Sequence, residues 1–65
     1  MRNRIRDFRT AKSWTQEDLA KAIAVSRQTI NAIEKGKFDP SLPTAFRLAQ
    51  LFETKIEELF IFEED

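Results

Sequence analysis

The 65-residue sequence contains no cysteine and no histidine. Their absence excludes disulfide bonds, the usual structural zinc sites and catalysis by a nucleophile paired with histidine. No segment approaches the roughly 20 apolar residues of a membrane span, and the N-terminus lacks the apolar run of a signal peptide. The chain has one glycine, so a Gly-rich phosphate loop is absent as well. We therefore expect a soluble, cytoplasmic protein that does not contact a membrane, is not an enzyme and has no cofactor or metal site.

The chain is also short, and its size limits how it can fold. A domain of this length buries only roughly 60% of the surface of its unfolded chain, and without disulfides or metals it is often stabilised by self-association. We expect one domain, residues 1–65, with its core in about residues 5–60. Such a chain has no room for a separate sensor domain, and no small-molecule effector is evident from the sequence.

The net charge is zero, but the charges are unevenly distributed. Residues 1–37 contain nine basic and four acidic residues, which gives a net charge of +5. Residues 38–65 contain two basic and seven acidic residues, which gives −5. A molecule with one basic end is suited to present that end to phosphates and to turn its acidic end away from them.

Apolar spacing and capping residues predict a compact, all-helical fold. Thr15, followed by Asp18 three residues later, is typical of a capping box at the start of a helix. Ser26 and Ser41 are N-cap candidates for two further helices, and Gly36 is suited to a left-handed position after a helix. The expected helices cover residues 3–12, 16–23, 27–35 and 42–52, and a short fifth helix ends near residue 60.

The two ends of the chain carry further expectations about packing. Thr54 and Glu57 form a second capping-box pattern, which would open the fifth helix. Trp14 is expected to cover the core between the first two helices rather than to stack on a base. The apolar pair Ile61–Phe62 leaves open whether the chain ends form short strands. The expected apolar faces contain Ile5, Phe8 and Ala11 in the first helix, and Leu42, Ala45, Leu48, Ala49 and Phe52 in the fourth.

The helix at residues 27–35 has two chemically different faces. At about 100° per residue, Ile30, Ile33 and Thr29 lie on one side and anchor the helix. Side chains of Arg, Gln and Asn can each make two hydrogen bonds to one base edge, and a small alanine can approach a thymine methyl group. The opposite side, an arc of roughly 140°, carries Arg27, Gln28, Asn31, Ala32 and Lys35.

A polar face alone is also what an ordinary surface helix shows. An expected helix of eight residues precedes this one, and a short turn separates them. This is the spacing of a helix-turn-helix motif, and it favours DNA recognition over an ordinary surface helix. We therefore expect the second helix of the pair to read DNA.

The run TQEDLAKAIAVSRQTINAIEKGKFDPS, residues 15–41, resembles the DNA-binding domain of the Cro and lambda-repressor family. It is especially similar to the small stand-alone regulators of the xenobiotic-response-element type, and the match extends over about residues 5–60. The resemblance implies a five-helix lambda-repressor-like domain. It also implies that Gln16 contacts a phosphate and supports the recognition helix, residues 26–35. The other DNA contacts it implies are base contacts by Arg27, Gln28 and Asn31, support from Ser26 or Thr29, and phosphate contacts by Lys35 and Lys37.

Some positions leave alternatives open. Arg9 and Glu34 match a pair that the family forms between the first helix and the recognition helix, but a surface ion pair of small energetic value is the alternative. Ala24 and Glu53 occupy positions where the family usually has glycine, and a left-handed Ala24 would cost roughly 1 kcal/mol. The N-terminal arginines are candidates either for phosphate contacts or for a solvated basic face: Arg2, Arg4 and Arg6.

The C-terminal part contains more apolar residues than one face of a short helix needs, which is typical of an interface. We therefore expect a homodimer, formed through the fourth and fifth helices and the C-terminal tail, that binds double-stranded DNA at a pseudo-palindromic operator. The expected function is transcriptional regulation, with repression favoured. A protein-interaction module, such as the antitoxin-like partner of another protein, is the alternative. The surplus residues are Phe52, Ile56, Leu59, Phe60, Ile61 and Phe62.

Overall fold

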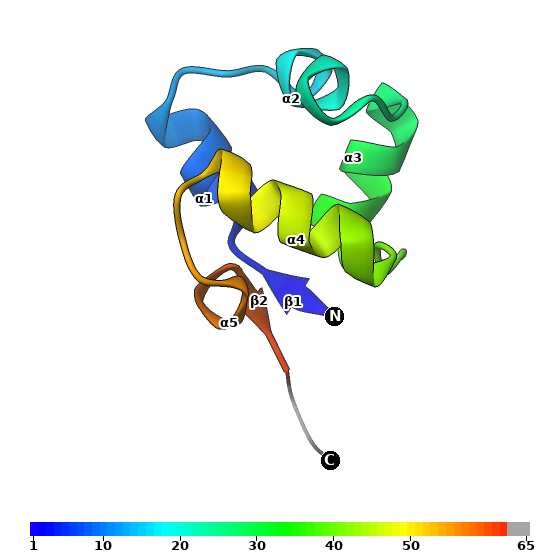
Figure 1. Cartoon of the computed structure of the whole chain (residues 1–65). Coiled ribbons are helices and arrows are strands. Elements are labelled where there is room, and N and C mark those ends of the chain that lie inside the picture. Colours follow the sequence, from blue (N-terminus) through cyan, green and yellow to red (C-terminus); the bar gives the residue numbers. More distant parts are fainter. Residues whose placement is uncertain (63–65) are drawn as a thin grey trace.

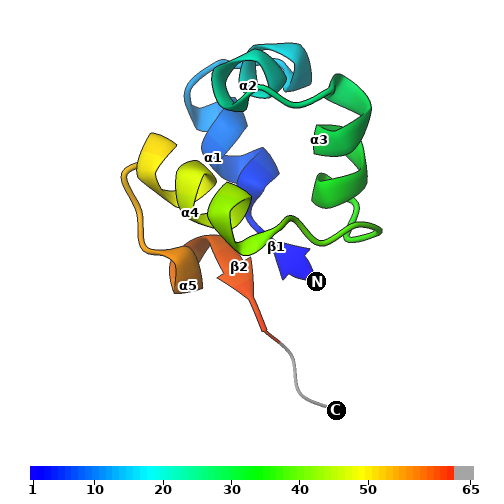
Figure 2. The same cartoon turned by 45° about the vertical axis from the view of Figure 1, so that its right-hand side comes forward.

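The computed structural model describes residues 1–62, in which five helices and two short strands follow one another (Figure 1). In both views α2 lies at one end of the molecule, and α5 and the strands lie at the other (Figures 1 and 2). The elements in chain order are β1 (Arg2–Asn3), α1 (Ile5–Ala11), α2 (Gln16–Ile23), α3 (Arg27–Glu34), α4 (Leu42–Leu51), α5 (Ile56–Leu59) and β2 (Phe60–Ile61).

The capping residues at the start of α2 and α3 behave as the sequence predicts. The Thr15 hydroxyl accepts a hydrogen bond from the backbone N–H of Asp18 at 3.0 Å, and the Asp18 carboxylate accepts one from the N–H of Thr15 at 2.8 Å. Ser26 caps α3 by accepting from the N–H of Thr29 at 3.1 Å. These bonds satisfy backbone donors that have no partner inside a helix. The caps therefore fix where both helices begin.

Residues with positive φ follow four of the helices in the described part of the chain, with Ser13 after α1. Ala24 closes α2 with φ 58° and ψ 45°, so the turn before α3 keeps the conformation that glycine would adopt without strain. Gly36 follows α3 with φ 73°, as the sequence predicts. Glu53, at the other position where the family favours glycine, also has a positive φ, of 53°. Ala24 and Glu53 thus adopt the left-handed backbone that glycine would adopt, at the cost of local strain.

One hydrophobic core joins all five helices in the described part of the chain. α2 and α3 contribute Leu19 and Ile30, which are both fully buried. Phe8 and Trp14 lie at its edge, with ring centroids 5.6 Å and 5.9 Å from that of Phe52. Trp14 therefore covers the core, as expected. The buried apolar residues are Ile5, Leu19, Ala20, Ile23, Ile30, Ile33, Ala45, Leu48, Ala49, Phe52, Leu59 and Phe60.

The chain ends form the short strands that the sequence left open. β1 and β2 are antiparallel, with Arg2 opposite Ile61 and Asn3 opposite Phe60. The N–H of Arg4 also donates to the oxygen of Leu59 at 2.8 Å. The prediction that the first helix covers residues 3–12 was wrong at its start, because pairing with β2 holds residues 2–3 in extended backbone.

Three further predictions were wrong in detail. The second capping box does not form: Lys55 is the N-cap of α5, and Thr54 donates from Oγ1 to Glu58 at 3.0 Å. α5 ends at Leu59, in agreement with the expected end near residue 60. Ala11 and Leu42 were expected in the core, but Ala11 is exposed and Leu42 has 65% of its surface accessible. Among residues 1–62, no helix has the length and apolar character needed to cross a membrane.

Candidate nucleic-acid interface

The two faces of α3 separate in the structure as its sequence predicts. Ile30 and Ile33 are 0% and 1% exposed and attach the helix to the core. Arg27 and Gln28, in the first turn, are exposed on the opposite side. A donor-rich pair of side chains thus lies at the start of a rigidly held helix, which is the part of a recognition helix that contacts base edges.

Two of the predicted site residues make hydrogen bonds inside the protein. The hydroxyl oxygens of Ser26 and Thr29 are 2.8 Å apart, and Ser26 also caps the helix. Thr29 is half-buried, whereas Ser26 is exposed. Their local role is therefore to hold the first turn of α3, next to Arg27.

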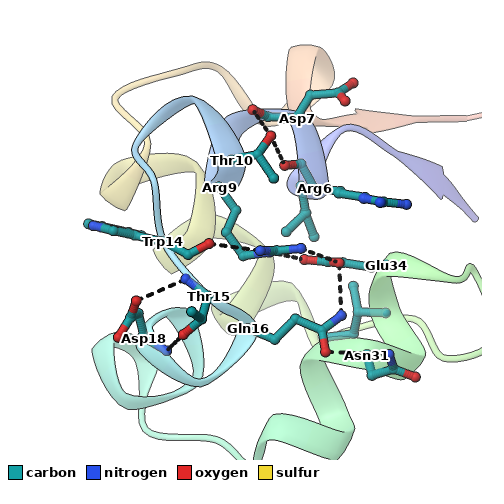
Figure 3. A network of polar contacts seen from close by, with 12 residues as sticks. Arg6, Asp7, Arg9, Thr10, Trp14, Thr15, Gln16, Asp18, Asn31 and Glu34 are labelled. Atoms are coloured by element: carbon teal, nitrogen blue, oxygen red, sulfur yellow. Dashed lines mark hydrogen bonds and ion pairs between the residues drawn. The ribbon is translucent and has the colours of Figure 1, made fainter.

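A buried polar network connects α1, α2 and α3 (Figure 3). The guanidinium of Arg9 donates to the Glu34 carboxylate from Nε at 2.7 Å and from Nη2 at 3.2 Å. Its Nη1 donates to the backbone oxygen of Trp14 at 2.7 Å. The two side chains are only 11% and 5% exposed, so this is a shielded pair and not the surface pair that was the alternative. The hydrogen bond to Glu34 raises the pKa of Arg9 above its ordinary value, against the opposing effect of burial.

Gln16 extends the network toward the exposed side of α3 (Figure 3). Its Nε2 donates to Oε1 of Glu34 at 3.1 Å, and its Oε1 accepts from Nδ2 of Asn31 at 3.4 Å. Asn31 is half-buried. A chain of contacts therefore runs from Arg9 through Glu34 and Gln16 to Asn31, and it fixes the orientation of two predicted site residues.

Gln16 also lies between two surface hollows. One hollow is lined by Gln16 together with Arg27 from the start of α3. The other is lined by Gln16 together with Asn31 and Lys35 from its later turns. Lys35 is the C-cap of α3, and both it and Lys37 are exposed. Lys37 lies beyond Gly36 and lines neither hollow. Seven of the eight predicted residues thus belong to α3, its caps or the N-terminus of α2.

The geometry is that of a helix-turn-helix unit, and the comparison with known proteins agrees. Residues 5–59 match the model of the family described as helix-turn-helix. The chain belongs to this family. An uncharacterised helix-turn-helix transcriptional regulator from Methanocaldococcus jannaschii is 57% identical over 65 residues, which cover 100% of this chain and 98% of the relative. The CTXphi transcriptional repressor RstR from Vibrio cholerae is 39% identical over 57 residues, which cover 88% of this chain and 51% of the repressor.

A solved structure of similar fold gives the same result. The restriction-modification controller protein C.AhdI from Aeromonas hydrophila superimposes with a TM-score of 0.78 and 35% identity, covering 88% of this chain and 86% of the controller. The present protein is thus a transcriptional regulator with a Cro-type helix-turn-helix DNA-binding domain, in a family of regulators and not of enzymes. Within this helix-turn-helix regulator, α2 and α3 are the two helices of the motif, and the left-handed Ala24 lies in its turn.

Of two further residues near the helix-turn-helix unit, Asn3 was assigned no role by sequence reasoning, and Arg6 was left open between a phosphate contact and a solvated basic face. Asn3 donates to the backbone oxygen of Ile33 at 2.8 Å and so contacts the C-terminal turn of α3. Arg6 lines the same hollow as Asn31 and Lys35. No local pattern identifies Asn3, because its partner is 30 positions away in the chain. The sequence named Arg6 among three arginines without distinguishing them, and the structure places it one turn before Arg9 in α1, at the hollow.

Proposed function

We propose that this regulator binds a pseudo-palindromic DNA operator as a homodimer, with α3 in the major groove, and represses transcription. The observation that carries the proposal is the arrangement of α3, whose apolar face is fully buried while Arg27 and Gln28 are exposed in its first turn. A fixed helix that presents bidentate hydrogen-bonding groups is what direct reading of base pairs requires.

Each predicted residue has a role in this proposal. Arg27 pairs with O6 and N7 of a guanine, and Gln28 and Asn31 pair with N6 and N7 of adenines. Gln16 holds the side chain of Asn31 in place and contacts a phosphate through its amide. Ser26 and Thr29 fix the first turn, and Lys35 and Lys37 contact the DNA backbone beyond the bases.

The homodimer is supported by an apolar hollow at the end of the molecule that includes β2. Leu42 is 65% exposed and Phe46 49%, although both are large apolar residues of α4. Contiguous exposed apolar patches are typical of surfaces that bind another protein. A two-fold dimer would place two copies of α3 about 34–36 Å apart, one turn of the DNA helix. The hollow is lined by Met1, Pro40, Leu42, Ala45, Ile56 and Phe60.

DNA binding is tested by selecting bound sequences from a random duplex library and titrating the best site by fluorescence across a salt series. Arg27→Ala should cost about 1–3 kcal/mol and relax specificity at one base position of each half-site. Arg47→Ala is the matched control, because Arg47 is an equally charged, exposed residue of α4. If Arg27→Ala bound every sequence with the same affinity as the parent, the proposal that α3 recognises bases would be wrong.

Dimer formation is tested by light scattering and by binding to full and half operators. Leu42→Glu should weaken self-association and reduce binding to the full operator more than to a half site. Gln50→Glu, which also adds a negative charge to an exposed position of α4, should leave both unchanged. A reporter gene behind the selected operator tests repression, and increased expression in the presence of the protein would contradict it. A stable complex with another protein and no DNA affinity would favour the interaction-module alternative.

A further inference from the structure

Three helices of the regulator surround a polar hollow of about 310 Å³ beside the recognition helix. α1 contributes Arg6 and Arg9, α2 contributes Gln16, and α3 with its C-cap contributes the rest. Figure 3 shows the Arg6 side chain extending from α1 on the side of the network where Glu34 lies. The full lining is Arg6, Arg9, Gln16, Asn31, Glu34 and Lys35.

The charges around this hollow are not balanced. Glu34 is its one acidic lining residue. The Glu34 side chain is 5% exposed, and its two oxygens accept two hydrogen bonds from Arg9 and one from Gln16. The negative charge of the Glu34 carboxylate is therefore compensated by Arg9 inside the protein, and little of the carboxylate is exposed to solvent.

Two cations at the hollow have no such compensation. Arg6 and Lys35 are both exposed. Neither side chain forms an ion pair or hydrogen bond with any group of residues 1–62. A concave polar surface with two uncompensated cations and amide donors attracts an anion, and a guanidinium can bind two oxygens of one phosphate.

We propose that this hollow is a binding subsite for one phosphate of the DNA backbone, and that Arg6, among the N-terminal arginines, is the cation that α1 contributes to it. This inference rests on the proposed DNA-binding function and deepens it. Arg6 approaches the anion from α1, Lys35 approaches it from the end of α3, and the amide of Gln16 donates from α2. The phosphate then contacts three helices at once, and this fixes the angle at which α3 enters the groove. Such contacts position a protein on DNA without reading sequence.

The subsite distinguishes Arg6 from Arg4, its exposed neighbour two residues away. Arg4 does not line the hollow. Arg6→Gln should lower the affinity for every sequence about tenfold or more, as expected for one charged hydrogen bond. It should also reduce the slope of log K against log salt by about 0.9, the value for one phosphate contact. Arg4→Gln should change both quantities much less.

The decisive measurement uses operators in which single phosphates are replaced in turn by neutral methylphosphonates. At one position per half-site, the neutral replacement should weaken DNA binding by the parent protein. At that same position, it should cause no further loss of affinity in Arg6→Gln. Lys35→Ala should couple to the same position. If Arg6→Gln instead loses affinity equally at every replaced position, or behaves like Arg4→Gln, the subsite does not exist. If the parent binds no duplex even at low salt, the proposed function itself fails.

Discussion

Nδ2 of Asn3 donates a hydrogen bond of 2.8 Å to the backbone oxygen of Ile33, in the last turn of α3. The Oδ1 atom of the same side chain accepts from the N–H of Ile5 at 3.2 Å, at the start of α1. The backbone of Asn3 pairs with Phe60 in the β-ribbon. One amide side chain therefore connects the paired chain ends to α3, the second helix of the helix-turn-helix motif.

Asn3→Ala should destabilise the protein by about 1 kcal/mol, because it removes a partly buried hydrogen bond. It should also lower DNA affinity for all sequences, since the turn that carries Lys35 is then held less firmly. Urea denaturation and fluorescence titration measure the two effects. The matched control is Thr54→Val, which removes a side-chain hydrogen bond to Glu58 next to α5. Equal losses of affinity in both variants would show that the effect is only one of stability.

The part of the fold that local chemistry determines could be predicted from the sequence. Thr15 and Ser26 fix the starts of α2 and α3 through hydrogen bonds to residues three positions on. Gly36 marks the end of α3 with a positive φ. The exposed side of α3 followed from its periodicity, because Ile30 and Ile33 have to face the core. These signals lie within one or two helical turns.

The features that were missed depend on contacts distant in the chain. Asn3 and Ile33 are 30 positions apart, and the pairing of β1 with β2 changes the start of α1. The capping box expected at Thr54 fails because its hydroxyl bonds Glu58 and α5 starts two residues later. Leu42 lies at the first position of α4, where the chain leaves the core, so periodicity alone did not predict its exposure.

Glu34→Ala should destabilise the protein by about 3 kcal/mol or more, because it leaves the buried guanidinium of Arg9 without its carboxylate. The double variant Arg9→Met/Glu34→Leu should recover part of this loss, since no unpaired charge then remains. Thermal and urea unfolding at one fixed protein concentration measure both, because dimer formation makes stability depend on concentration. A cost below about 1 kcal/mol for Glu34→Ala would place the pair among ordinary surface ion pairs.

Asp18 should make α2 sensitive to acid. Hydrogen bonds from the backbone and side chain of Thr15, with a smaller effect of Lys21, hold the pKa of Asp18 below its ordinary value of 3.8. A lowered folded-state pKa stabilises the fold above the unfolded pKa, and this contribution is lost as the pH falls through 3.8 toward the folded value. Asp18→Asn should therefore lower the melting temperature at pH 7, and the difference from the parent should shrink below about pH 4.

Melting curves from pH 7 to pH 2.5 test this expectation. Glu17→Gln is the matched control, because Glu17 is an exposed acid in the same first turn but does not take part in the capping box. Its difference from the parent should be small at pH 7. A constant difference between Asp18→Asn and the parent over the whole pH range would mean that the charge of Asp18 does not contribute.

Ala24→Gly should stabilise the protein, although glycine usually destabilises a helical region. Ala24 has φ 58° and ψ 45°, and this left-handed conformation costs a residue with a Cβ about 1–2 kcal/mol. Replacement by glycine removes that strain but increases the entropy of the unfolded chain, which costs about 0.4–1 kcal/mol. The expected net gain is about 0.5–1 kcal/mol. Ala22→Gly, two residues earlier and exposed inside α2, should instead lose about 1 kcal/mol, because its backbone is helical. Urea denaturation of the two variants should therefore give changes of opposite sign, and a loss in both would show that the turn between α2 and α3 is not strained at Ala24.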